Sequence, residues 1–170
     1  MKKSVIKNTV FAAVFAALIF VAIWVIAIPN GVGGVIHFGD ALIYVGAAVL
    51  PFPYGLFAAS IGAGLFDLLR YPVWTPFTIV IKPLMVLCFA NRNEKILSGA
   101  GARNYIAPFT AGALNVGLYF LANVYLFDGV AGGVRALPGL AIQSGGSVVC
   151  FFVMAFSLDK FKFKQELNRI

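Results

Sequence analysis

The sequence predicts an all-α integral membrane protein with six transmembrane helices, and three observations support this fold class. Hydrophobic residues make up 61% of the chain and charged residues only 11%, whereas soluble domains average about 45–50% apolar and about 25% charged residues. Apolar runs recur between Pro, Gly, Asn and charged residues. At roughly 20 residues per span, the 170 residues accommodate about six helices and little else. We expect one membrane domain over residues 1–170.

The six helices are expected in order along the chain, each ending at residues that break helices. Their approximate ranges are 8–28, 39–51, 54–70, 76–90, 105–127 and 133–158. The first follows Lys2, Lys3 and Lys7, as the apolar segment of a signal peptide would. It is longer than such a segment and no small-x-small cleavage site follows it, so we interpret it as a retained helix.

The second and third helices are predicted to be short. Their apolar runs of about 11 and 16 residues, at a rise of 1.5 Å per residue, do not reach across about 30 Å of hydrocarbon. Pro51 and Pro53 separate them. Proline fixes its own φ and biases the preceding residue away from the helical region, so we expect a stiff turn and a tight helical hairpin.

The basic residues predict the orientation. With six spans both termini lie on one side, and only Arg70, Lys82 and Arg135 of the 13 Lys and Arg residues fall outside that side. The positive-inside rule therefore places both termini in the cytoplasm, as in a multi-pass protein of a bacterial plasma membrane. This topology accounts for the net charge of +7, so we expect contact with the lipid bilayer and not with nucleic acid.

Polar side chains from several helices are predicted to converge in the outer half of the membrane. Lys82 lies within "PFTIVIKPL" and needs a partner or a wet cavity at that depth. Asn115, Tyr119 and Asn123 are spaced four apart and share one helix face. Such a cluster is typical of a small-ligand pocket. The candidate substrate-binding residues are His37, Asp40, Lys82, Asn115, Tyr119, Asn123 and Gln143.

These residues also have structural interpretations. Asp40 could cap the second helix, Asp67 and Arg70 could pair with each other, and the asparagines could join helices. The single histidine, His37, is too little for a metal site. The sequence contains no nucleophile beside a base and no P-loop, so we expect no metal, no cofactor and no enzymatic activity. Any ATP hydrolysis would belong to partner subunits.

The first helix carries a stripe of small residues in its cytoplasmic half. Ala12 and Ala16 lie four apart, as do Ala13 and Ala17. Small residues at this spacing allow another helix to approach closely within a membrane. The stripe either packs within the monomer or docks a partner on the inner side.

Four segments, taken in order, resemble a known family. They are the alanine stripe, "HFGDALIYVGAAVLP", "GAGLFDLLRYP" and "TPFTIVIKPLM". The arrangement is similar to the S components of energy-coupling factor (ECF) vitamin transporters, of the riboflavin-transporter-like branch. The resemblance implies a substrate-binding subunit that works with a transmembrane coupling (T) subunit and two ABC ATPases, and that topples to deliver its vitamin inward.

The resemblance also implies roles for particular residues. Ala12, Ala13, Ala16 and Ala17 would dock on the coupling subunit. The loop after the first helix would form a lid over the ligand, with Pro29, Asn30, Gly31, Gly33 and Gly34 as its candidate residues.

For the substrate, neutral polar groups, one lysine and aromatic side chains such as Trp74 and Tyr119 suit a small polar heteroaromatic ring. We favour pyridoxine or hydroxymethylpyrimidine, with riboflavin as the alternative. An alternative of another class is a stand-alone ion-coupled secondary transporter with Asp40 or Asp67 as proton carrier. Such carriers often contain inverted repeats, and we find no convincing internal repeat in the sequence.

Overall fold

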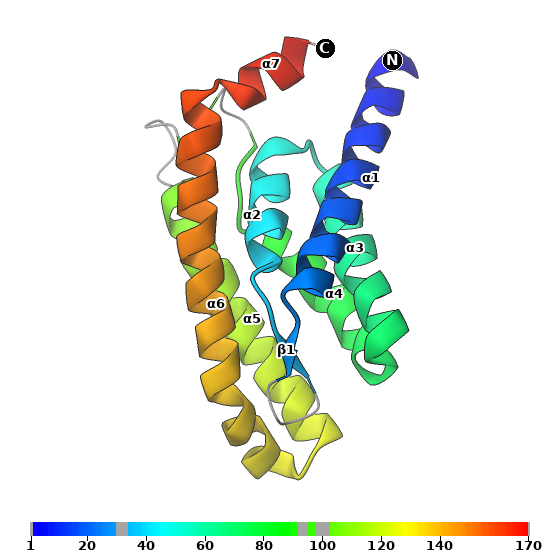
Figure 1. The fold of residues 1–170 in the computed structure, drawn as a ribbon, viewed down its shortest axis with the longest axis vertical. Helices are drawn as coiled ribbons and strands as arrows, with labels where there is room; N and C mark the ends of the chain where they lie inside the picture. Colours follow the sequence, from blue (N-terminus) through cyan, green and yellow to red (C-terminus); the bar gives the residue numbers. More distant parts are fainter. Residues whose placement is uncertain (1, 30–33, 92–94, 98–102, 170) are drawn as a thin grey trace.

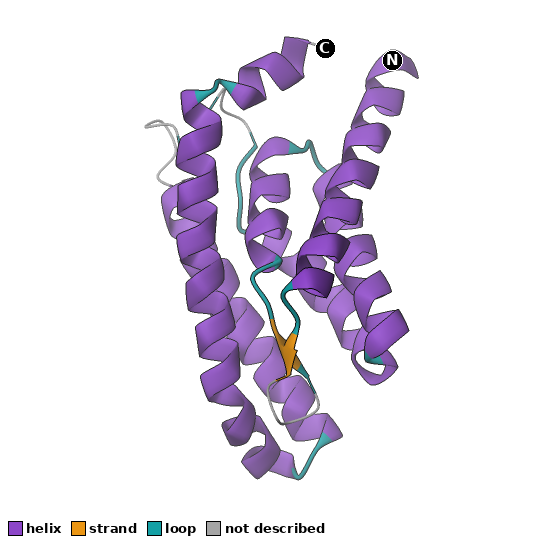
Figure 2. Ribbon diagram, in the orientation of Figure 1, coloured by secondary structure: helices purple, strands orange, loops and turns teal. Residues whose placement is uncertain are grey.

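The computed structural model describes residues 2–29, 34–91, 95–97 and 103–169, and these residues are almost entirely helical (Figures 1 and 2). In the described part of the chain the main helices are α1 (Lys2–Val25), α2 (Asp40–Val49), α3 (Tyr54–Arg70), α4 (Thr75–Val86), α5 (Arg103–Leu126) and α6 (Gly129–Lys160). A 3-10 turn, η1 (Pro72–Trp74), precedes α4, and a short helix, α7 (Phe163–Arg169), follows α6. Two short strands, β1 (Ile28–Pro29) and β2 (Val35–Ile36), connect α1 to α2.

Helix α2 is enclosed by the other helices. It contacts α1, α3, α4 and α6, while α1 packs on α3, α3 on α4, α4 on α5 and α5 on α6. Nine of the ten α2 residues are buried. A helix that is apolar on all sides is stable when protein surrounds it, which explains how a segment too short to span a bilayer alone is accommodated.

The structure confirms an all-helical architecture typical of a membrane protein. Helices α1, α5 and α6 are each long and apolar enough to cross a bilayer, whereas α2 and the η1–α4 segment are shorter. Large apolar side chains such as Leu121, Val149 and Val153 are exposed on the outside of the bundle, as expected for contact with lipid. The two chain ends lie at the same end of the molecule (Figure 1). The number of spans and the side on which the termini lie stay predictions.

The fourth helix is shorter than the range 76–90 expected from the sequence, because it ends at Val86. Arg103, at the start of α5, donates from Nε to the carbonyl of Cys88 (2.8 Å) and from Nη2 to that of Leu87 (2.6 Å). Basic side chains commonly satisfy carbonyls that a helix leaves free at its end. Arg103 of α5 therefore fixes the end of α4 through these hydrogen bonds. The apolar pattern of the sequence does not predict such contacts.

Two local elements were not predicted from the sequence. In the ribbon between α1 and α2, Ile28 pairs with Ile36 and Pro29 with Val35 in antiparallel register. The basic tail, expected only as a juxtamembrane end, forms α7. Lys164 donates from Nζ to the carbonyl of Ala48 in the last turn of α2 (2.7 Å), where the helix dipole favours a cation.

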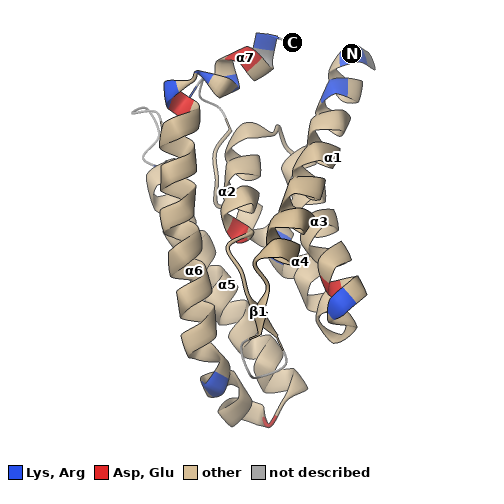
Figure 3. Ribbon diagram, in the orientation of Figure 1, with Lys and Arg blue, Asp and Glu red and all other residues tan. Residues whose placement is uncertain are grey.

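Charged residues gather toward the two ends of the bundle, and few interrupt its apolar middle (Figure 3). At the end that carries the termini, Lys7 of α1 donates from Nζ to the carbonyl of Leu167 in α7 (3.2 Å). Asp159 accepts from the amides of Ile96 and Leu97 at 2.7 and 2.8 Å. The first contact joins α1 to α7, and the second joins α6 to the α4–α5 connection.

Helices α1 and α3 lie close together at Gly62. A Cβ atom at this position would lie 2.6 Å from the carbonyl oxygen of Ala16 and 2.9 Å from the Cβ of Ile19. Gly62→Ala is therefore expected to lower the free energy of unfolding by about 1–3 kcal/mol, because backbone would have to move. Gly117→Ala is the matched control, since nothing lies within 4 Å of a Cβ there. Thermal unfolding in detergent measures both; equal effects would contradict the close packing.

Candidate functional site

A buried ion pair lies at the centre of the bundle. Lys82 of α4 donates from Nζ to Asp40 Oδ1 of α2 at 2.7 Å and to Asn115 Oδ1 of α5 at 3.0 Å. All three residues are at most 1% exposed. The sequence argument that Lys82 needs a partner is met by a carboxylate and an amide from two other helices.

The pair is extended by hydrogen bonds to α6. Gln143 donates from Nε2 to Asp40 Oδ2 (2.9 Å), and Asn115 donates from Nδ2 to Ser144 Oγ (3.2 Å). Gly39 occupies the N-cap position of α2, and no side chain caps it. The carboxylate of Asp40 is thus engaged by Lys82 and Gln143, and the capping interpretation of this residue is wrong.

A second chain of hydrogen bonds joins α3, α4 and α5. Thr78 donates from Oγ1 to Asp67 Oδ2, and its oxygen lies 2.6 Å from the hydroxyl of Tyr119. The guanidinium of Arg70 lies over the ring of Trp24, 4.9 Å from its centroid. Asp67 and Arg70 therefore have different partners, and the structure does not support the local pairing considered from their spacing.

Several of these side chains line a cavity of about 50 Å³. Five of the seven predicted candidates line it, namely His37, Lys82, Tyr119, Asn123 and Gln143. Asp40 and Asn115 are not among the lining residues; they hold Lys82 through the bonds described above. A cavity of this size holds a few water molecules, so the site is narrow in this state.

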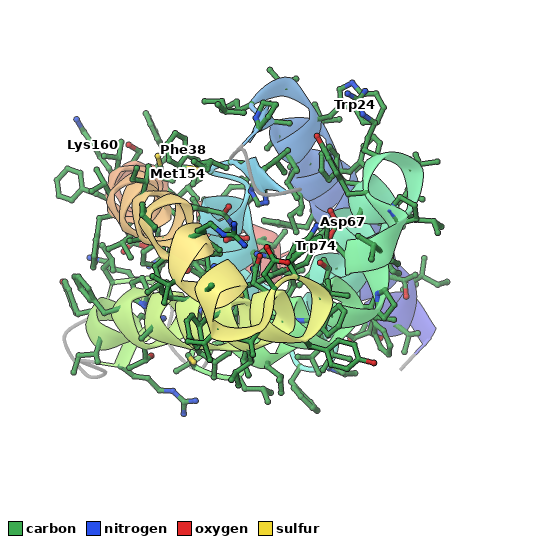
Figure 4. All side chains as sticks on the ribbon, turned by 90° about the horizontal axis from the view of Figure 1, so that it is seen from below. Trp24, Phe38, Asp67, Trp74, Met154 and Lys160 are labelled. Carbon is green, nitrogen blue, oxygen red and sulfur yellow. The ribbon has the colours of Figure 1, made fainter. Side chains whose placement is uncertain are left out.

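Sequence reasoning missed Asp67 and Tyr71 as lining residues and placed Trp74 only among aromatic groups available for stacking; all three line the cavity. Figure 4, viewed from the end opposite the termini, shows Asp67 and Trp74 close together. The ring of Trp74 lies 5.8 Å from that of Tyr119, between centroids. The signal that could have found Asp67 was its place near the outer end of an apolar helix, where an acidic residue is expensive.

Two polar atoms at the cavity have no hydrogen-bond partner among the residues that the structure describes. They are His37 Nδ1 and Asn123 Oδ1, on residues that are 7% and 3% exposed. The amide nitrogen of Asn123 is occupied, because it donates to the carbonyl of Tyr119 at 2.7 Å. Buried polar groups are nearly always satisfied in folded proteins, so these two atoms are suited to meet a ligand or water.

The ribbon that connects α1 and α2 lies beside the cavity. Gly34 and Val35 line it, whereas Pro29 is exposed in β1. The other lid candidates, Asn30, Gly31 and Gly33, lie outside the described residues. Of the two lid candidates within the described residues, Gly34 therefore lies at the cavity wall and Pro29 is not among the lining residues.

The alanine stripe divides between two surroundings. Ala12 and Ala16 are buried, at 8% and 7% exposure, and Ala16 meets α3 at Gly62. Ala13 and Ala17 are exposed. All four line an apolar groove between α1 and α3. One half of the stripe therefore packs within the monomer and the other half faces outward.

His37 precedes α2 and gives the protein an acid-sensitive position. Burial lowers its pKa from 6.5 to about 4, with Asp40 opposing the shift and Lys82 adding to it. Between these values the unfolded chain binds more protons than the folded one, so stability falls as pH drops from 6.5 toward 4. The loss reaches on the order of 3 kcal/mol by pH 4.

His37→Asn removes this titration and keeps a polar side chain. We expect the variant to show a flatter decline of melting temperature between pH 6.5 and 4 than the unaltered protein, measured in detergent without ligand. Identical pH profiles for the two proteins would contradict a buried neutral His37.

Two comparisons bear on the family. The family model for the ECF-type riboflavin transporter, S component, matches residues 3–144. A protein of Pyrococcus woesei, described as an uncharacterized protein in the gap 3'region, is 26% identical over 133 residues, which cover 75% of this chain and 84% of that protein. The matched range includes the alanine stripe, the ion pair and every residue that lines the cavity. The chain therefore belongs to the family of ECF-type riboflavin transporter S components, the substrate-binding subunits of vitamin uptake systems and not enzymes.

Proposed function

We propose that this S component captures a small vitamin or vitamin precursor in the cavity beside the β1–β2 ribbon and delivers it across the cell membrane. The observation that carries the proposal is a small cavity, lined by polar and aromatic side chains, inside an otherwise apolar bundle. Small-ligand sites combine aromatic walls with a few placed polar groups. His37, Lys82, Tyr119, Asn123 and Gln143 would contact the ligand, and Asp40 and Asn115 would position Lys82.

The favoured substrate is pyridoxine or hydroxymethylpyrimidine, with riboflavin as the alternative. A cavity of about 50 Å³ between Tyr71, Trp74 and Tyr119 requires less rearrangement for a single ring than for the three fused rings of a flavin. Gly34 and Val35 lie at its wall, which supports a lid formed by the segment from Pro29 to Gly34.

Transport would require a T subunit and two ABC ATPases, as the S-component family implies. We place six spans in the bilayer with both termini cytoplasmic, on the basis of the basic residues at that end. The exposed Ala13 and Ala17 in the α1–α3 groove support docking of the T subunit there. Toppling of the S component would then open the cavity inward.

The test has two stages. Mass spectrometry of the purified chain is expected to identify a copurified single-ring vitamin or precursor, and titration of the emptied chain to show saturable binding of it. In liposomes, uptake should require ATP together with the T subunit and both ATPases. Flux that follows a proton gradient in liposomes containing this chain alone would instead favour a secondary transporter, and uptake that persists without the ATPases would overturn the coupling.

A further inference from the structure

The cavity carries one negative charge that no described residue neutralises. Its charged lining residues are Lys82 and Asp67. Lys82 is balanced by Asp40 at 2.7 Å. Asp67 forms no ion pair among the described residues; Thr78 donates to one of its oxygens. His37 is neutral near pH 7, because burial lowers its pKa to about 4. A positive charge on a ligand would complete the balance.

The direction of the hydrogen bonds can be worked out from the number of protons. The hydroxyl of Thr78 has one hydrogen and gives it to the Asp67 carboxylate. The contact between Thr78 and Tyr119, at 2.6 Å, therefore needs Tyr119 as the donor. The hydroxyl hydrogen of Tyr119 is thus used within the protein, and its oxygen is left to accept.

Asn123 adds a further acceptor. Its amide nitrogen is bound to the carbonyl of Tyr119, and its Oδ1 is buried and finds no partner in the described part of the chain. Asp67, Tyr119 and Asn123 come from two helices and line the same cavity. The cavity therefore offers a carboxylate, a phenolic oxygen and an amide oxygen to whatever enters it.

Aromatic rings complete the site. Trp74 and Tyr71 line the cavity with Tyr119, and the centroids of Trp74 and Tyr119 are 5.8 Å apart. The faces of such rings carry partial negative charge and attract cations, and they accept a flat ring by stacking. These surroundings favour positive charge and N–H groups on a planar molecule and disfavour a carboxylate.

We propose that Asp67 is the specificity-determining residue of the site, and that it selects an amino-substituted or protonated nitrogen heterocycle whose N–H groups it accepts together with Asn123 and the hydroxyl oxygen of Tyr119. The inference rests on the proposed function, because it names the ligand class for the same cavity. It also assigns a role to a residue outside the predicted binding set.

The experiment compares two probes that differ in one group. The first is 4-amino-5-hydroxymethyl-2-methylpyrimidine, and the second has a methyl group in place of the amine. Calorimetric titration of the full chain in lipid nanodiscs is expected to show binding of the amino probe at least tenfold tighter. Asp67→Asn should remove that preference while leaving affinity for the methyl probe unchanged. Asp128→Asn is the matched control, because Asp128 is exposed and pairs with Arg135, and it should keep the preference.

The possible results distinguish a failure of the proposed ligand class from a failure of the proposed S-component function. Equal binding of the two probes by the unaltered chain, or tighter binding of nicotinate than of either, would overturn the inference even if Asp67→Asn fails to fold. Binding of riboflavin alone would also overturn it and would leave the S-component function intact. No binding of pyridoxine, riboflavin or either pyrimidine would contradict the proposed function as well.

Discussion

Replacing Lys82 by methionine is expected to lower the free energy of unfolding by about 3–5 kcal/mol, because it leaves the carboxylate of Asp40 buried without its charge partner. Asp40 is fully buried and 2.7 Å from Lys82 Nζ, and the variant leaves its carboxylate with Gln143 as a neutral side-chain partner. Thermal unfolding in detergent measures the loss. Ligand affinity should fall as well, since Lys82 lines the cavity.

A double variant separates the pair from the individual residues. Asp40→Asn combined with Lys82→Met removes both charges and should recover most of the stability, because contacting residues are not additive. Lys160→Met, at an exposed lysine in the last turn of α6, is the control and should change stability by no more than about 0.5 kcal/mol. A loss for Lys82→Met as small as that of the control would contradict the buried pair.

Ala17→Leu is expected to abolish ATP-dependent uptake while vitamin binding by the isolated chain stays unchanged. Ala17 is exposed and lines the α1–α3 groove, so a leucine would fill the surface on which a helix of the T subunit would pack. Uptake in proteoliposomes with the complete transporter and ligand titration of the chain alone are the two measurements.

The matched control is Ala113→Leu, the same substitution at an exposed alanine of α5 away from the groove. It should leave both uptake and binding intact. Ala16→Leu is less informative, because Ala16 also packs on Gly62 and its enlargement would disturb the fold. Normal uptake by Ala17→Leu would remove the groove from the docking mechanism.

The need of Lys82 for a partner was easier to predict from the sequence than the rest of the site. A lysine deep in an apolar helix has few ways to be stable, so the need for a partner on another helix followed from the cost of burial alone. The identity of that partner did not, because Asp40 also fitted a helix cap. Only the packing of α2 against α4 and α6 directs its carboxylate to Lys82 and Gln143.

Asp67 shows the opposite case. Its spacing from Arg70 suggested a local ion pair. Instead, the hydroxyl of Thr78, 11 residues away on α4, donates a hydrogen bond to the carboxylate of Asp67. Contacts between neighbouring helices depend on helix rotation, which one sequence does not specify. The β1–β2 ribbon was not predicted for another reason. Each strand has two residues, which are too few to show the alternation typical of a strand.

The enclosed position of α2 was only partly predictable. Its shortness was evident, since ten residues rise about 15 Å. The sequence of a short apolar helix does not show whether lipid or protein surrounds it. The difference lies in the lengths and tilts of the other helices, which form a wall around α2.

The Lys82–Asp40 pair has a consequence for how the domain responds to membrane voltage. A potential of 100 mV does work of about 2.3 kcal/mol on each elementary charge that crosses it. Two opposite charges 2.7 Å apart that move together through the bilayer give contributions that nearly cancel. If the domain topples during transport as proposed, the pair would add almost no gating charge to that movement. With a cationic ligand on Asp67 the loaded site would also be neutral, which would make translocation of the loaded site electrically silent.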